Sequence, residues 1–100
     1  MHTSSFKMVV IIAEPVLEHR VTQELKQLGA RGFSVVEGRG EGTRRVHATD
    51  LPGENVRIEA IVTPEVADRI MEHVARHYFA HYSMIAFVHD VAVARTGKYA

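Results

Sequence analysis

A stretch rich in glycine and arginine, residues 38–53, is the part of this sequence best suited to binding chemistry. Its first half contains Gly38, Gly40, Gly42, Thr43, Arg44 and Arg45. Glycines let backbone amides approach a ligand, and arginine offers forked donors that match phosphate or carboxylate oxygens. The stretch therefore predicts a cradle for an anionic small molecule. On these residues alone, a solvated connection whose arginines bind nothing is an equal alternative.

The glycine spacing matches no standard phosphate motif. A Walker A loop requires Gly-x4-Gly-Lys-Ser/Thr, which the sequence lacks, and a Rossmann fingerprint follows the first strand and opens a helix. Here the glycines follow the second expected strand and open a loop of sixteen residues. Most connections in small domains have about 2–6 residues, and longer ones are usually functional or disordered.

Histidines form the second candidate group. His73, His77 and His81 recur every four residues, so on a helix they line one flank, where two imidazoles can chelate zinc or copper. No carboxylate joins them at a suitable spacing, which favours a solvated flank. Cysteine is absent, and Ser34 and Ser83 lack the surroundings of a nucleophilic serine. We therefore assign no catalytic residue, no metal ligand and no covalently bound cofactor.

Composition excludes several classes of partner. Lys and Arg number 12, as do Asp and Glu, so no net charge draws the chain to nucleic acid or to an anionic membrane. The longest apolar run, 8–13, is far shorter than the roughly 20 residues of a membrane span. No export signal precedes it, so a cytoplasmic location without membrane insertion is the default expectation.

The elements that must position the loop follow from hydrophobic spacing. Apolar runs predict strands at 6–13, 31–37, 54–62 and 84–94. Helical spacing predicts one helix from Pro15 to a Gly29 cap and another that begins at Thr63 and Pro64. Residues 1–5 and 95–100 are expected to be tails.

This order predicts one α+β domain over residues 1–100, a ferredoxin-like βαββαβ sandwich with a four-stranded antiparallel sheet and two helices on one face. The other sheet face is left open and is apolar enough that self-association is its natural cover. Phe79 falls off the apolar face of the second helix, either as a lone exposed aromatic or as a subunit contact.

Four segments carry a family resemblance, in the order Gly32-Phe33-Ser34-Val35-Val36, Gly40-x-Gly42-Thr43-Arg44-x-Val46, Val56-x-Ile58-Glu59-x-Ile61-Val62-Thr63 and Tyr78-Phe79-x-x-Tyr82. Across residues 6–94 the chain resembles the PII signal-transduction proteins, and more specifically the PII-like proteins associated with carboxysomes and bicarbonate transporters.

The resemblance implies a homotrimer that binds adenine nucleotides between its subunits. It also implies that the protein is not an enzyme. The long loop would instead signal to an inorganic-carbon transporter or a carboxysome-related partner. Bicarbonate is a second implied ligand. The residues that would line the nucleotide site are Gly32, Phe33, Ser34, Val35, Gly40, Gly42, Thr43, Arg44, Arg45, His47, Glu59, Val62, Thr63, Ile85, Ala86 and Phe87. A trimeric ferredoxin-like metal-binding protein that uses the helix histidines is the alternative, and a small nucleotide hydrolase is a third hypothesis.

Departures from the family pattern reduce the range of nucleotides and modifications that we expect. The family's glycine-lysine turn before the last strand grips the distant phosphates of ATP, but Ser83 and Met84 stand there, so the resemblance favours AMP or ADP. The loop has no tyrosine, which disfavours uridylylation of the usual kind. His47 stands where relatives often carry an arginine and suggests pH sensitivity.

Overall fold

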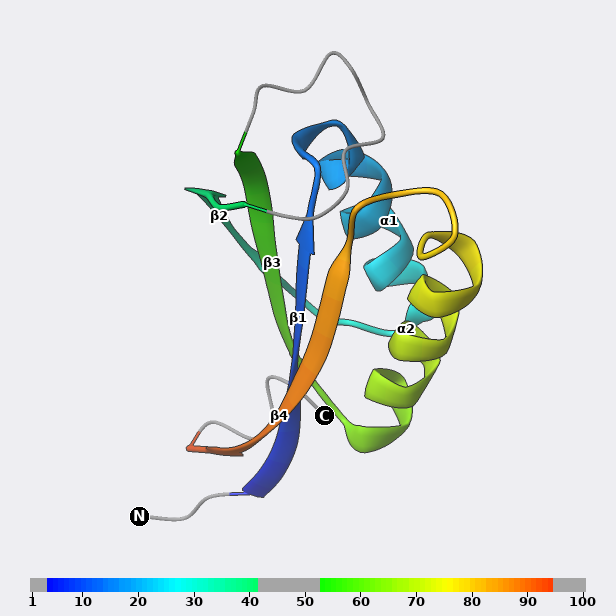
Figure 1. Cartoon of the computed structure of the whole chain (residues 1–100). Coiled ribbons are helices and arrows are strands. Elements are labelled where there is room, and N and C mark those ends of the chain that lie inside the picture. Colours follow the sequence, from blue (N-terminus) through cyan, green and yellow to red (C-terminus); the bar gives the residue numbers. More distant parts are fainter. Residues whose placement is uncertain (1–3, 42–52, 95–100) are drawn as a thin grey trace.

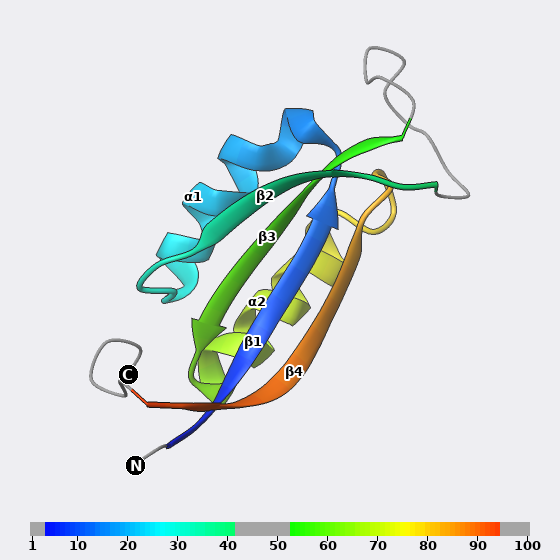
Figure 2. The same cartoon turned by 90° about the vertical axis from the view of Figure 1, so that its left-hand side faces the viewer.

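The computed structural model describes residues 4–41 and 53–94, and these form the predicted sandwich. In chain order the elements are β1 (Ser4–Ala13), the 3-10 turn η1 (Pro15–Leu17), α1 (Glu18–Leu28), β2 (Ser34–Arg39), β3 (Glu54–Val62), α2 (Pro64–His77) and β4 (Ile85–Val93). The strands pair antiparallel in the order β2-β3-β1-β4. Both helices lie on one face of the sheet (Figure 1), and none of the described elements covers the other face (Figure 2). The predicted ferredoxin-like α+β fold is confirmed.

The element boundaries differ from the prediction at several places, and β2 begins at Ser34 rather than at residue 31. Ser4 and Ser5 belong to β1 rather than to a tail, because they pair with Val93 and Ala92 of β4. Gly38 and Arg39 extend β2 into the predicted loop, because they pair with Asn55 and Glu54. Pro15 opens a single 3-10 turn, and α1 begins only at Glu18. Residues 42–52 and 95–100 lie outside the described part of the chain.

The helix ends follow the predicted chemistry. Gly29 closes α1 with φ of 117°, a left-handed conformation in which a side chain would be strained. At the start of α2 the Thr63 hydroxyl oxygen accepts a hydrogen bond from the Val66 amide at 3.4 Å, and Pro64 follows. Both helices are thus fixed at the ends that join them to the sheet.

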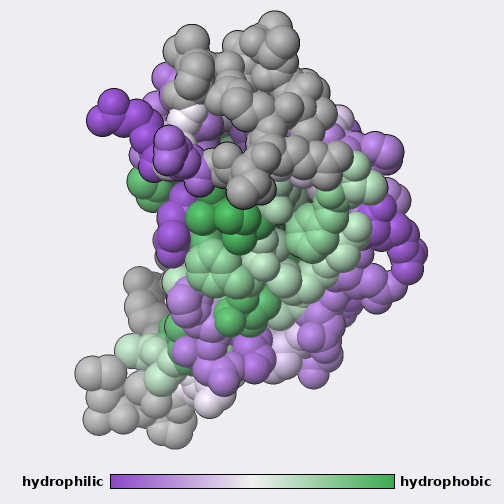
Figure 3. Space-filling model, viewed as in Figure 1, coloured by the Kyte–Doolittle hydropathy of each residue, from purple (hydrophilic) through white to green (hydrophobic). Residues whose placement is uncertain are grey.

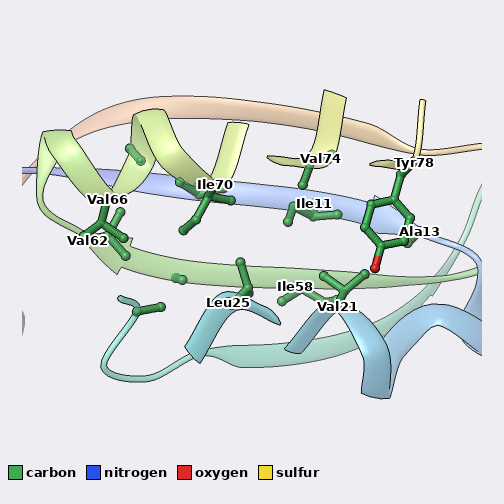
Figure 4. Close-up of a cluster of buried hydrophobic side chains, with 14 of the residues drawn as sticks. Ile11, Ala13, Val21, Leu25, Ile58, Val62, Val66, Ile70, Val74 and Tyr78 are labelled. Carbon is green, nitrogen blue, oxygen red and sulfur yellow. The ribbon is translucent and has the colours of Figure 1, made fainter. Parts of the chain in front are cut away.

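The core lies between the helices and one face of the sheet. Alternate residues of β1 and β3 point toward the helices, and all are 3% exposed or less: Val9, Ile11, Ala13, Val56, Ile58, Ala60 and Val62. They pack against Val21 and Leu25 of α1 and against Val66, Ile70 and Val74 of α2, with Tyr78 at one end (Figure 4). Within 4–41 and 53–94 neither helix is long and apolar enough to cross a membrane.

Candidate functional site

Three predicted site residues share one row across the open face of the sheet. The register pairs Ser34 of β2 with Glu59 of β3, Glu59 with Val10 of β1, and Val10 with Phe87 of β4. Directly paired residues project to the same face. Strands spaced about 4.8 Å apart put Ser34, at one edge of the sheet, about 14 Å from Phe87 at the opposite edge.

The next row contains a residue that the sequence reasoning missed. It runs Val36, Arg57, Ile12 and Ile85, of which only Ile85 was a predicted site residue. Arg57 Nε donates to Glu59 Oε2 at 2.7 Å, and its guanidinium carbon lies 5.8 Å from the centre of the Phe87 ring. Two-residue spacing on one strand puts Arg57 and Glu59 on one face, and that signal was available in the sequence.

Three other predicted site residues point away from the open face. Val62 belongs to the buried core, and Val35 and Ala86 pack against it. Only their backbone amides and carbonyls could reach a ligand. Thr63 caps α2 through its hydroxyl oxygen, which leaves the hydroxyl hydrogen free to donate elsewhere.

The segment before β2 is exposed along an outer edge of the sheet. Phe33 is 36% exposed, and the Lys26 ammonium lies 5.6 Å from its ring centre, within the range of a cation–π contact. A Cβ added at Gly32 would meet no atom within 4 Å. Gly32–Val35 therefore lies at the β2 edge and Ile85–Phe87 at the opposite β4 edge, so one chain does not close a cleft around both groups.

The predicted loop starts from a closed neck. The Gly40 amide donates to the Gly53 carbonyl at 2.7 Å, and Gly53 has φ of 81°. The Asn55 amide group packs beside Gly38, where an added Cβ would approach Asn55 Oδ1 to 3.1 Å. Two members of the predicted cradle, Gly38 and Gly40, are described, and Gly38 pairs with Asn55 as part of β2 rather than lying in a loop. Gly42, Thr43, Arg44, Arg45 and His47 lie outside the described residues.

A hollow of about 660 Å³ lies beside the neck, on the helix side of the sheet. Its described lining consists of Pro15, Glu18, Glu37, Gly38, Arg39, Glu54, Asn55 and Val56. Of these only Gly38 belonged to the predicted cradle, and three carboxylates face one arginine. The described walls therefore disfavour an anionic ligand, and we do not assign the nucleotide site to this hollow.

His73, on the histidine flank of α2, takes part in a hydrogen-bonded network between the two helices. Glu24 Oε1 of α1 accepts from the Tyr78 hydroxyl at 2.6 Å and lies 2.8 Å from His73 Nε2. Arg20 completes the group, with its guanidinium carbon 4.8 Å from the Tyr78 ring centre. Sequence spacing could not reveal Glu24 as the partner, because it lies 49 residues before His73.

Charge and burial act together in this network. Burial alone would raise the pKa of Glu24, but hydrogen bonds from Tyr78 and His73 outweigh it and hold that pKa below its usual range. Burial, followed by the bond to Glu24, raises the pKa of the Tyr78 hydroxyl far above its usual value. The His73 and His77 rings lie 4.4 Å apart. Within the described ranges, no group of three His, Cys, Asp or Glu side chains is arranged to hold a metal ion.

Comparison with known proteins identifies close relatives of this fold and sequence. The model of the family described as nitrogen regulatory protein P-II matches residues 6–98. A protein of Thermus thermophilus described as a PII-like signalling protein is 44% identical, with a TM-score of 0.86 over 100% of both chains. CPII of Thiomonas intermedia, bound to ADP and bicarbonate, is 26% identical, with a TM-score of 0.84 over 99% of this chain and 98% of its own. CPII has also been solved with ADP, AMP and acetate, with a TM-score of 0.81 and the same identity and coverage.

Proposed function

The chain belongs to the P-II family of nitrogen regulatory proteins, and we propose that it is a PII-like regulator which binds an adenine nucleotide between the subunits of a homotrimer. The observation that carries this proposal is the row Ser34–Glu59–Val10–Phe87, which brings predicted ligand contacts from β2, β3 and β4 onto one open face. The protein regulates a partner and does not catalyse a reaction.

Two features support a site completed by a second copy of the chain. The candidate groups Gly32–Val35 and Ile85–Phe87 lie at opposite edges of the sheet, so a neighbouring subunit can join the edge of one copy to that of the next. Apolar side chains are exposed at both edges, with Val36 51% and Ile85 59% exposed. Figure 3 shows the apolar surface over β4 and the region between β4 and α2.

AMP and ADP are the proposed nucleotides, and bicarbonate is a second proposed ligand. CPII, which shares 26% of its residues with this chain, binds ADP, AMP and bicarbonate. Thr43, Arg44 and Arg45 would contact the phosphate or bicarbonate oxygens, and Ser83 and Met84 replace the turn that would grip the distant phosphates of ATP.

The long loop is the proposed output. Ligand contacts at Thr43, Arg44 and Arg45 would favour one loop conformation, and a membrane transporter for inorganic carbon or a carboxysome-related protein would read it in the cytoplasm. His47 would make that response depend on pH. The closed Gly40–Gly53 neck supports this role, because it fixes where the loop leaves the sheet.

Isothermal titration with AMP, ADP and ATP, each with and without bicarbonate, tests the proposal. We expect saturable binding that is tighter for AMP or ADP than for ATP. Arg44→Ala should remove a charge-assisted contact of about 1.5–3 kcal/mol, or roughly tenfold to a hundredfold in affinity. Arg76→Ala, which removes an arginine from the exposed flank of α2, is the matched control. No heat with any adenine nucleotide at millimolar concentration would exclude this function.

Sedimentation equilibrium with and without ADP tests the assembly, and a mass of three chains is expected.

The histidine-based metal alternative gains no support from the geometry, because His73 Nε2 is already engaged by Glu24. Zinc titration monitored by mass spectrometry would restore that alternative if binding were stoichiometric and lost in His77→Ala.

A further inference from the structure

We propose that Arg57 is a positioning residue for the nucleotide site, and that it holds Glu59 and Phe87 in place across the open face of the sheet. The inference rests on the proposed function, because Glu59 and Phe87 are candidate ligand contacts in that proposal. Arg57 acts through these two side chains and does not itself contact the nucleotide.

The first contact fixes Glu59. Arg57 and Glu59 lie two residues apart on β3, and both project from the open face. Arg57 Nε donates to Glu59 Oε2 at 2.7 Å, a distance typical of a charge-assisted hydrogen bond. The side chains are 39% and 30% exposed, so solvent screens the pair and its contribution to folding stability is small. What the bond mainly determines is the direction in which the Glu59 carboxylate points.

The second contact reaches across a strand. Phe87 lies on β4, and β1 separates β4 from β3. The Arg57 guanidinium nevertheless lies 5.8 Å from the Phe87 ring centre, within the range of a cation–π interaction. The Phe87 ring also meets the His89 ring edge-on, with the ring centres 5.2 Å apart and the ring planes at 73°. The Phe87 ring therefore contacts two other side chains of the open face, Arg57 and His89.

The burial of Val10 supports this bridge. Val10 projects from the open face, which no helix covers, yet it is 0% exposed. Its direct partners in the sheet are Glu59 on one side and Phe87 on the other. The side chains of this row and of Arg57, which crosses above it, supply the cover that a helix supplies on the opposite face. The contacts of this cluster are all made within one chain.

A preorganised cluster improves binding because less side-chain freedom is lost when the ligand docks. Without Arg57, the Glu59 carboxylate and the Phe87 ring gain rotamers, and part of the binding free energy must order them again. Lysine keeps the charge but lacks the planar fork that can bond a carboxylate and stack on a ring together. Arg57→Lys should therefore retain only part of the ligand affinity that Arg57 provides.

The test is isothermal titration of the full chain with ADP. We expect Arg57→Gln to weaken binding about threefold to tenfold and Arg57→Lys to give an intermediate loss. Arg76→Gln makes the same substitution in an exposed ion pair on α2, where Arg76 Nη2 lies 2.6 Å from Glu72, and should bind as the wild type does. If Arg57→Gln does not fold, the comparison of Arg57→Lys with the wild type replaces it, and equal affinity there also overturns the proposal.

A double-mutant cycle asks whether Arg57 acts through Glu59. Arg57→Gln combined with Glu59→Gln should lose less affinity than the product of the two single losses, because the residues work as one unit. Strictly multiplicative losses would overturn the positioning role.

The open face is also the proposed subunit contact, so a variant could bind ADP weakly only because its subunits no longer assemble. Sedimentation equilibrium of each variant distinguishes this loss of assembly from a loss of side-chain positioning. Weaker ADP binding at an unchanged mass supports the inference. Weaker binding that appears only together with loss of assembly overturns it, as does an Arg57→Gln chain that binds like the wild type. If the wild-type chain has no affinity for adenine nucleotides, the proposed function is excluded together with the inference. If wild type and variant bind equally, only the positioning role of Arg57 is excluded.

Discussion

The same four strands supply both faces of the sheet, but the two faces are covered in different ways. On the helix side, Val9, Ile11 and Ile58 are almost fully buried against α1 and α2. On the open side, charged and polar groups stand among apolar ones, and side chains such as Arg57 and Phe87 cover one another. The comparison separates a face that completes its packing within one chain from a face that we propose contacts the ligand or another copy.

Neighbouring isoleucines on β1 give the largest test of this difference. Ile11 is 0% exposed in the core, whereas Ile12 is half-buried on the open face. Ile11→Ala should cost about 2–5 kcal/mol of unfolding free energy, because it leaves a cavity in a packed core. Ile12→Ala should cost less than half as much in urea denaturation at low protein concentration. Equal losses at that concentration would contradict the distinction, whereas a loss for Ile12→Ala that grows with protein concentration would identify the open face as a subunit contact.

The second test breaks the polar network on the helix side. Tyr78 is 0% exposed, and its hydroxyl donates to Glu24 at 2.6 Å. Tyr78→Phe keeps the packed ring but removes the donor, and we expect a loss of about 1.5 kcal/mol in chemical denaturation. ADP affinity should hardly change, because this network lies on the covered side of the molecule. Arg76→Ala, on the exposed flank of the same helix, should stay within about 0.5 kcal/mol of the wild type.

The third test uses acid to address the same network. The folded protein holds the pKa of Glu24 below its usual range, because hydrogen bonds from Tyr78 and His73 outweigh the effect of burial. The network therefore adds stability above the ordinary glutamate pKa of about 4.3, and this stability is lost as pH falls through the lower pKa of the folded state. Melting temperatures measured from pH 7 to pH 3 should fall less steeply for Glu24→Gln. Parallel curves for the two proteins would show that Glu24 carries no such linkage.

Substitution of Gly32 is expected to change stability least, and it distinguishes an effect on folding from an effect on ADP binding most clearly. Its φ is not in the left-handed region, and an added Cβ would meet no described atom within 4 Å, so nothing in residues 4–41 and 53–94 requires glycine there. Gly32→Ala should leave the melting temperature unchanged or slightly higher. If the ligand or a neighbouring subunit approaches this backbone, ADP affinity should fall while stability is retained. A variant that binds ADP normally would remove Gly32 from the site.

The sequence was most informative where local chemistry decides structure. The Gly29 cap, the Thr63–Pro64 helix start and the alternation of Val56 and Ile58 in β3 all follow from rules that act within a few residues. These features led to the correct fold class, and the order of the segments led to the family.

Contacts set by strand register were beyond sequence reasoning. The approach of Arg57 to Phe87 and that of Glu24 to His73 depend on how distant segments align in space. The alternation in β3 already placed Val62 on the same side as Val56 and Ile58, and the structure shows that Val35 and Ala86 also pack against the core. The proposed roles of Thr43, Arg44 and Arg45 stay predictions.

The central place of β1 in the sheet has a consequence for synthesis of the chain. Residues 4–13 leave the ribosome before both of their partners, since they pair with 54–62 on one side and 85–93 on the other. This apolar segment can therefore complete its pairing on both edges only after residue 93 has been made. Pairing across such sequence separations is slow and leaves strand edges open to aggregation during folding. We infer that a nascent chain truncated before β4 would be the form most dependent on chaperones.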